Sequence, residues 1–234
     1  MCRMIGFISS KPIEVAEYFE AVKKQAQYGK HAPHKDGWGF ATYGKDEFNF
    51  KKSLKPIWED VYKGPSEAEV AVIHARQASP NTKIIYQNAH PFVFQQNNEI
   101  WSLIHNGGIK SYPNSWGNEL DSKIIANLIE GRIRNSDALT AVKDSVNLIK
   151  ENCVFSSINF FLASSKVFIV LRLSDDSHKL FYKIQDDLFE VSTEPVETDW
   201  IEMENSTIFY VQKIENTLKI EKIRIFAEPD QNNR

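Results

Sequence analysis

Residues 158–173 have the sequence INFFLASSKVFIVLRL, in which two apolar runs rich in β-branched and aromatic residues flank a short polar segment. Such runs are typical of β-strands. Four more follow, so the last third of the chain is predicted to be mostly strand. The strands expected there are 158–163, 167–173, 179–184, 189–192, 208–214 and 218–225.

Helices are expected mainly in other parts of the chain. Apolar residues at helical spacing predict a helix over 12–27, with Pro12 in its first turn. Two further helices are expected at 121–132 and 136–150, the second with Ser136 as its N-cap. The remaining expected strands are 3–9, 38–43, 47–54, 70–74, 92–95 and 100–105, with a hairpin across 44–46. Because helices and strands occur in separate runs, the pattern predicts an α+β fold, which we expect to form one domain over 1–234.

Composition limits the function classes that need to be considered. The chain has 234 residues, 42% of them hydrophobic, and a net charge of −3, so it lacks the basic excess of a nucleic-acid-binding protein. No apolar run reaches the length of a membrane span, and the apolar stretch near the N-terminus is too short for a secretory signal. We therefore expect a cytoplasmic protein without nucleic-acid or membrane partners. Its two cysteines, Cys2 and Cys153, are too few for a disulfide framework.

Unusual polar segments are concentrated in one part of the chain. Five of the six histidines lie between His31 and His105. The same region contains the segments HKDGWG at 34–39, HARQAS at 74–79, NAHPF at 88–92 and HNGG at 105–108. Three of these four begin or end at a predicted strand terminus, where loops commonly carry functional residues.

Cys2 has the chemistry of an N-terminal nucleophile. Its side chain is small enough to permit removal of Met1, which would leave a thiol and a free α-amino group on one residue. The amine has a reference pKa near 8, so it can serve as a base close to neutral pH. A thiolate is the reactive form of cysteine. One residue can therefore supply both nucleophile and base.

Together with Cys2, these segments resemble the class II glutamine amidotransferases, which are N-terminal-nucleophile (Ntn) hydrolases. The matches, in order, are the Cys2 strand, His-x-Arg-x-Ala at 74–78, Asn-x-His-Pro at 88–91, His-Asn-Gly at 105–107 and an acidic helix start at 121–126. The segment at 34–39 further resembles the small stand-alone branch, which includes γ-glutamyl hydrolases. The resemblance implies a four-layer αββα sandwich of two antiparallel sheets.

The resemblance also implies a reaction and a catalytic set. Cys2 would attack the side-chain amide of glutamine or a γ-glutamyl compound, form a thioester, and release glutamate with ammonia or an amine. Asn106 and Gly107 match the oxyanion hole of the family. No cofactor or metal is expected.

Three further residues match substrate contacts of the family. Arg76 corresponds to the group that binds the substrate α-carboxylate, for which a planar guanidinium is well suited. Asp121 corresponds to the partner of the α-ammonium group, although an acid at a helix start is also common for structural reasons. Ser79 stands where the family often has Thr, and is expected to hydrogen-bond the substrate.

Two departures from the family concern the use of ammonia and the surroundings of the nucleophile. Gln77 and Pro80 stand where many synthase-linked members have Trp and His, and Arg3 stands where many have Gly. The chain would then release ammonia, act directly on a γ-glutamyl amide, or supply ammonia to a separate partner subunit.

Two alternatives remain open from the sequence. One is a non-catalytic or regulatory protein on the same scaffold, which retention of Met1 would favour. The other is a metal hydrolase that uses histidines of the cluster. Its ligands would be His31 and His34 with Asp36, His74 or His90, although the chain lacks a His-Glu-x-x-His motif.

Overall fold

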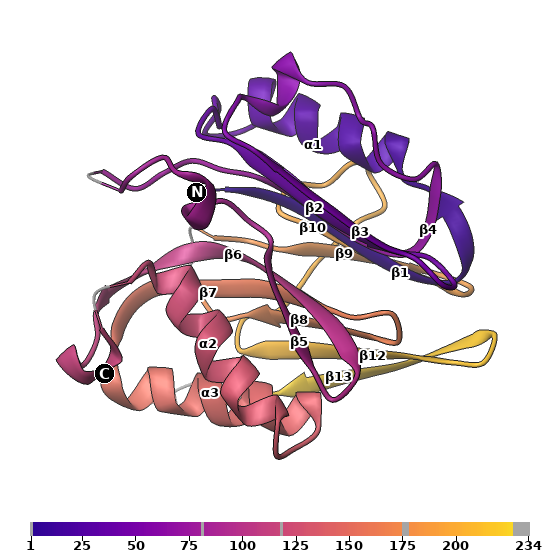
Figure 1. Cartoon of the computed structure of the whole chain (residues 1–234). Coiled ribbons are helices and arrows are strands. Elements are labelled where there is room, and N and C mark those ends of the chain that lie inside the picture. Colours follow the sequence, from indigo (N-terminus) through magenta and orange to yellow (C-terminus); the bar gives the residue numbers. More distant parts are fainter. Residues whose placement is uncertain (1, 81, 118, 175–177, 227–234) are drawn as a thin grey trace, which may run out of the picture.

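The computed structural model describes residues 2–80, 82–117, 119–174 and 178–226, and two β-sheets stacked on each other form its centre (Figure 1). All strand pairings among these residues are antiparallel. The first sheet has the order β11 (Ile201–Glu202), β9 (Phe181–Gln185), β10 (Leu188–Ser192), β1 (Arg3–Glu14), β4 (Glu67–Ala75), β2 (Trp38–Tyr43) and β3 (Phe48–Ser53). The second sheet has the order β13 (Thr217–Arg224), β12 (Thr207–Ile214), β8 (Val167–Arg172), β7 (Val154–Ala163), β6 (Glu99–Ser111) and β5 (Phe92–Gln96).

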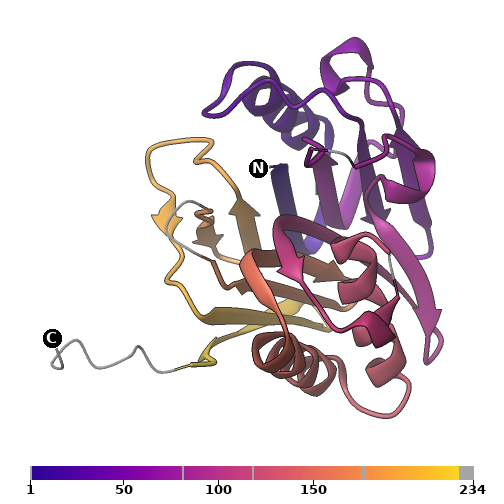
Figure 2. The same cartoon turned by 90° about the vertical axis from the view of Figure 1, so that its left-hand side faces the viewer.

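Helices cover the two outer faces of the stacked sheets. Helix α1 (Ala16–Tyr28) lies on the first sheet, and α2 (Asp121–Ile133) and α3 (Ala138–Asn152) lie on the second (Figure 1). The turned view shows the same succession of layers (Figure 2). The α+β class and the four-layer αββα sandwich are therefore confirmed. Short 3-10 helices at Ile57–Glu59, Tyr86–Asn88 and Asn114–Trp116 lie in the connections.

Apolar side chains fill each of the three interfaces between layers. Phe161, Phe168 and Phe189 lie in the layer between the two sheets. A second cluster packs α1 on the first sheet around Phe19 and Trp38. The third and largest cluster packs α2 and α3 on the second sheet. Burial of these side chains from water is the main favourable term that holds the layers together.

The N-terminal strand is longer than the sequence suggests, and this changes the start of the first helix. The helix expected from Pro12 begins at Ala16 instead, because β1 continues to Glu14. Ile13 pairs with Ala68 after a shift in register that follows Ile8. Pro12 lies within this irregularity, where its missing N–H does not interrupt the ladder.

The cap of α3 also differs from the expectation. Ser136 was expected to cap this helix, but Asp137 is the N-cap, and its side chain accepts a hydrogen bond from the Thr140 N–H at 3.0 Å. The Ser136 hydroxyl donates instead to the Arg132 carbonyl at the end of α2. Both residue types favour this position, so composition alone does not discriminate between them.

Most other elements agree with the sequence prediction. The hairpin of residues 38–43 and 47–54 is present as β2 and β3, which pair over their full length. The two-residue strand β11 was not expected, because its pairing with β9 depends on distant residues. No helix in the described residues is long and apolar enough to cross a membrane.

Candidate active site

Neighbouring strand ends of the first sheet bring Cys2 and Arg76 together. Cys2 immediately precedes β1 and Arg76 immediately follows β4, and Arg3 is paired with Ala75 in the antiparallel ladder. The thiol of Cys2 lies 3.7 Å from the carbonyl oxygen of Gln77. Strand register thus places Cys2 and Arg76, which are 74 positions apart in the sequence, at the same end of two neighbouring strands.

The second sheet contributes Asn106 from the middle of β6. The main-chain nitrogen of Cys2 donates to Asn106 Oδ1 at 2.8 Å. This contact orients the amide, because only its oxygen can accept. The Asn106 carbonyl accepts from the Ser157 hydroxyl, whereas the buried Nδ2 has no hydrogen-bond partner among the described residues. A fixed, unused donor therefore lies next to the nucleophile candidate.

Gly107 follows Asn106 and allows the second strand to approach closely. A Cβ atom built there would lie 1.9 Å from the carbonyl oxygen of Ser157 on β7, a distance that no side chain can adopt. Glycine is required at this point for steric reasons as well as for any chemical role. Gly107 lines the same small cavity as Cys2.

Burial is the main influence on the pKa of the Cys2 thiol. Removal from solvent raises its pKa, the positive charge of Arg76 lowers it, and the negative charge of Asp121 raises it further. The protonated thiol is therefore favoured in the resting protein. A base that accepts the proton during attack is needed for reactivity.

Arg76 and Asp121, which are 45 positions apart in the sequence, both line the cavity that contains Cys2. The Arg76 side chain is almost fully buried, and its Nη1 has no hydrogen-bond partner among the described residues. Asp121 opens α2, and its carboxylate accepts from the N–H of Ser122 at 2.7 Å and from that of Ile109 at 3.1 Å. One cationic and one anionic group thus border a common space with Cys2.

Two connected cavities lie around these residues. The inner one, which contains Cys2, has a volume of about 30 Å³, enough for only one or two water molecules. The outer one has a volume of about 560 Å³. Both are lined by Ser79, Thr82, Leu120 and Asp121. Ser79 is exposed at this boundary. Five of the six predicted site residues line the inner cavity, and the sixth, Asn106, is hydrogen-bonded to Cys2.

Asp36 holds the segment that carries Arg76. Its carboxylate accepts a hydrogen bond from the N–H of Ala78 at 2.8 Å. The backbones of 36–37 and Arg76 exchange two further hydrogen bonds, of 2.8 and 3.0 Å. The sequence did not predict this role, because Asp36 was considered there only as a possible metal ligand. The unusual HKDGWG sequence at 34–39 was the one local feature that marked Asp36 as a residue of interest.

The buried histidines form a neutral cluster at the inner cavity, which His90 and His105 line. His74 donates through Nε2 to the His105 carbonyl at 3.2 Å, and its ring stacks on that of His90 with centroids 4.1 Å apart. Burial lowers the pKa of His74 to about 3 and that of His90 well below its usual value. His105 contacts the Ser122 hydroxyl through Nδ1 at 2.8 Å. These contacts order the loops around Arg76 and Asp121.

Arg3 and Glu194 form an ion pair that the sequence did not reveal. Arg3 is completely buried, donates through Nη1 to the carbonyl of Cys2 at 3.1 Å, and pairs through Nη2 with Glu194. Glu194 follows β10, which pairs with β1. The side chain of Arg3, a residue at which this chain departs from the family, thus contacts the main-chain carbonyl of the nucleophile candidate Cys2.

The histidines do not converge on a metal-binding geometry. His31 is exposed, whereas His34 is buried with its Nδ1 3.3 Å from the carbonyl oxygen of Ala26. Within 2–80, 82–117, 119–174 and 178–226, no three His, Cys, Asp or Glu side chains are placed to hold a metal ion.

Two solved structures share this fold. Glutamine phosphoribosylpyrophosphate amidotransferase from B. subtilis superposes with a TM-score of 0.72 at 19% identity, covering 97% of this chain and 50% of that one. A predicted glutamine amidotransferase from Pseudomonas aeruginosa PA01 superposes with a TM-score of 0.60 at 18% identity, covering 91% of this chain and 98% of that one. At these identities the likeness concerns the fold.

Sequence relatives point to the same family. YafJ of Escherichia coli (strain K12), which is assigned to the glutamine amidotransferases, is 31% identical over 117 residues. The match covers 48% of this chain and 45% of YafJ, so it spans less than half of that relative. The family model of the class II glutamine amidotransferases matches residues 1–123. The chain belongs to the class II glutamine amidotransferase family.

Proposed function

We propose that this protein hydrolyses the side-chain amide of glutamine or of a γ-glutamyl compound, with Cys2 as nucleophile once Met1 is removed. The thiol sulfur attacks the amide carbon while its proton passes, through a water molecule, to the freed α-amino group of Cys2. The intermediate then expels ammonia or an amine, which takes that proton. Water hydrolyses the resulting thioester, releases glutamate and restores the thiol.

The contact between Cys2 and Asn106 is the observation that carries this proposal. Oδ1 of Asn106 is occupied by the Cys2 nitrogen at 2.8 Å, so Nδ2 remains as a buried donor beside the thiol. When the Cys2 sulfur attacks the amide carbon, negative charge develops on the substrate's carbonyl oxygen. That oxygen would accept hydrogen bonds from Asn106 Nδ2 and from the Gly107 N–H. Donors aimed at developing charge typically contribute about 3 kcal/mol each to transition-state stabilisation.

Charge placement supports a substrate with an amino-acid end. The guanidinium of Arg76 suits an α-carboxylate, and the carboxylate of Asp121 suits an α-ammonium group. Asp121 is held by two backbone N–H groups, so its position is defined before substrate arrives. Ser79 would add a hydrogen bond at the boundary of the two cavities.

The size of the cavities bears on how substrate enters. The inner cavity of about 30 Å³ is too small for glutamine, whereas the outer cavity of about 560 Å³ adjoins it along Ser79 and Asp121. A bound substrate would therefore extend across this boundary. Ammonia or the amine would leave to solvent, or pass to a separate accepting subunit.

A screen of γ-glutamyl compounds with glutamate release as readout tests the proposal. Glutamine, γ-glutamyl amides and γ-glutamyl peptides would be offered to protein whose Met1 removal has been confirmed by intact mass. Cys2→Ala should abolish release, whereas Cys153→Ala should retain it, because Cys153 lies apart from the cavity. Full release by Cys2→Ala would contradict the proposed mechanism.

A further inference from the structure

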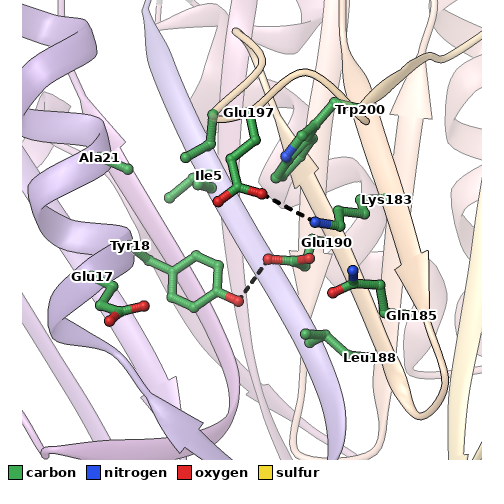
Figure 3. A pocket seen from close by; sticks show the side chains of 11 residues that line it. Ile5, Glu17, Tyr18, Ala21, Lys183, Gln185, Leu188, Glu190, Glu197 and Trp200 are labelled. Carbon is green, nitrogen blue, oxygen red and sulfur yellow. Dashed lines mark hydrogen bonds and ion pairs between the residues drawn. The ribbon is translucent and has the colours of Figure 1, made fainter.

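A separate cavity of about 310 Å³ lies on the outer face of the first sheet, beside α1 (Figure 3). Strand register places Ile5, Glu190 and Lys183 on that face, which points away from the second sheet. Tyr18 of α1 forms one wall, and Trp200 in the connection from β10 to β11 forms another (Figure 3). The volume lies at the lower end of the range for small-molecule sites.

Glu190 is the most informative residue in this cavity. It is only 8% exposed, and its Oε1 accepts a hydrogen bond from the Tyr18 hydroxyl at 2.7 Å. In the part of the chain that the structure describes, no hydrogen bond reaches the other carboxylate oxygen. The Glu190 side chain lines the cavity.

The nearest cation is already engaged by other carboxylates. Lys183 Nζ lies 2.7 Å from Asp199 and 3.3 Å from Glu197. Glu17 also lines the cavity, so its lining carries three carboxylates, Glu17, Glu190 and Glu197, against one ammonium group. The excess of negative charge favours a cationic occupant and disfavours an anionic one.

Burial makes the charge of Glu190 costly without a further partner. Desolvation raises the pKa of its carboxyl group, while the Tyr18 hydrogen bond and the charge of Lys183 lower it. A cation in the cavity would add a favourable interaction with the ionised form. The Tyr18 and Trp200 rings offer aromatic surfaces to such a cation.

We propose that this cavity binds a small organic cation, with an ammonium or guanidinium group against Glu190 and an apolar body between Tyr18 and Trp200. Ile5 and Leu188 provide apolar contacts for that body. A bare metal ion does not fit, because no three His, Cys, Asp or Glu side chains in the described ranges are placed close enough together to hold one. The site goes beyond the proposed hydrolase function, and none of its lining residues lines the cavity of Cys2.

Isothermal titration calorimetry of the full chain with agmatine, tryptamine and butylamine tests the site. At least one of these amines should bind with a Kd below about 1 mM, a modest affinity for a ligand of this size. Glu190→Gln keeps a hydrogen-bond acceptor for Tyr18 but removes the charge, and should weaken binding at least about tenfold. Trp200→Ala, which changes a connecting segment, should weaken it as well.

Two control variants locate the binding. Glu14→Gln removes a carboxylate from the exposed end of β1 and should leave the affinity unchanged. Asp121→Asn should also leave it unchanged, which separates this cavity from the candidate active site. The proposal is overturned if none of the three amines binds. It is also overturned if folded Glu190→Gln and Trp200→Ala both bind the amine as tightly as the unmodified protein does. Loss of binding in Asp121→Asn alone would likewise overturn it.

Discussion

The main-chain nitrogen of Cys2 donates to Oδ1 of Asn106 at 2.8 Å, and this contact joins the two sheets at the candidate active site. Cys2 precedes the central strand β1 of the first sheet, while Asn106 belongs to β6 of the second. The nucleophile candidate and its candidate oxyanion donor are therefore held by separate layers. Their relative position depends on how the layers pack.

Asn106→Asp tests the oxyanion donor with almost no change in volume. The Cys2 contact can be kept, but a carboxylate oxygen replaces the Nδ2 donor. We expect kcat for glutamate release to fall about 100- to 1000-fold, with a smaller change in KM, because the donor acts on charge in the transition state. Steady-state kinetics would measure this. The matched control Asn147→Asp, on the exposed face of α3, should leave kcat unchanged.

Arg76→Lys tests the carboxylate contact. Lysine keeps the charge but loses the planar, two-pronged donor geometry. We expect KM for the amino-acid substrate to rise about tenfold or more, with kcat less affected, since the α-carboxylate is bound equally in ground and transition states. Arg134→Lys on the exposed surface serves as the control. An unchanged KM in Arg76→Lys would remove Arg76 from substrate binding.

Asp36 is expected to act as a positioning residue through Ala78. Asp36→Ala removes the acceptor at 2.8 Å from the Ala78 N–H, and we expect kcat/KM to fall about tenfold. Asp36→Asn keeps an acceptor oxygen and should recover most of this loss. Asp46→Ala, in the exposed turn between β2 and β3, should have no effect. Equal losses in the Ala and Asn variants would contradict a role through this hydrogen bond.

The neutral histidine cluster predicts a loss of stability in acid. The pKa values of His74 and His90 are lowered in the folded protein, so the unfolded chain binds more protons below its usual histidine pKa of about 6.5. Their contribution to stability is therefore complete above that pH and declines as the pH falls towards 3, the folded value of His74.

His90→Phe tests this explanation. Phenylalanine can keep the stacking on His74 but cannot take up a proton. Between pH 6 and pH 5, the free energy of unfolding from urea titrations should decline less steeply in His90→Phe than in the unmodified protein. The two slopes should differ by about 1.4 kcal/mol per pH unit. His31→Asn replaces an exposed histidine, and should leave the slope unchanged. An unaltered slope in His90→Phe would show that His90 does not titrate with unfolding.

The site residues could be predicted where local patterns mark them. Cys2, Arg76 and Asp121 each stand at a strand or helix end within a recognisable segment, and strand register brings the first two together. Glu194 could not be found in this way. Its partner Arg3 lies 191 positions away in the sequence, and nothing local to either residue indicates that β10 runs beside β1.

The fold shows the same division between local and distant causes. Apolar alternation and turn residues suffice to predict the β2–β3 hairpin, because both strands are adjacent in sequence. The start of α1 was misplaced because residues 13–14 pair with β4, some 50 positions further along the chain. Helical periodicity across Pro12 and Ile13 was overridden by this tertiary pairing.

Glutamate release before and after removal of Met1 from a single preparation tests whether Cys2 must be the N-terminal residue to act as the nucleophile. Protein that retains Met1, verified by intact mass, would be divided and one half treated with methionine aminopeptidase. We expect release from glutamine or a γ-glutamyl compound only in the treated half, because only there does Cys2 carry the free amine that accepts the thiol proton. Equal release from both halves would contradict it.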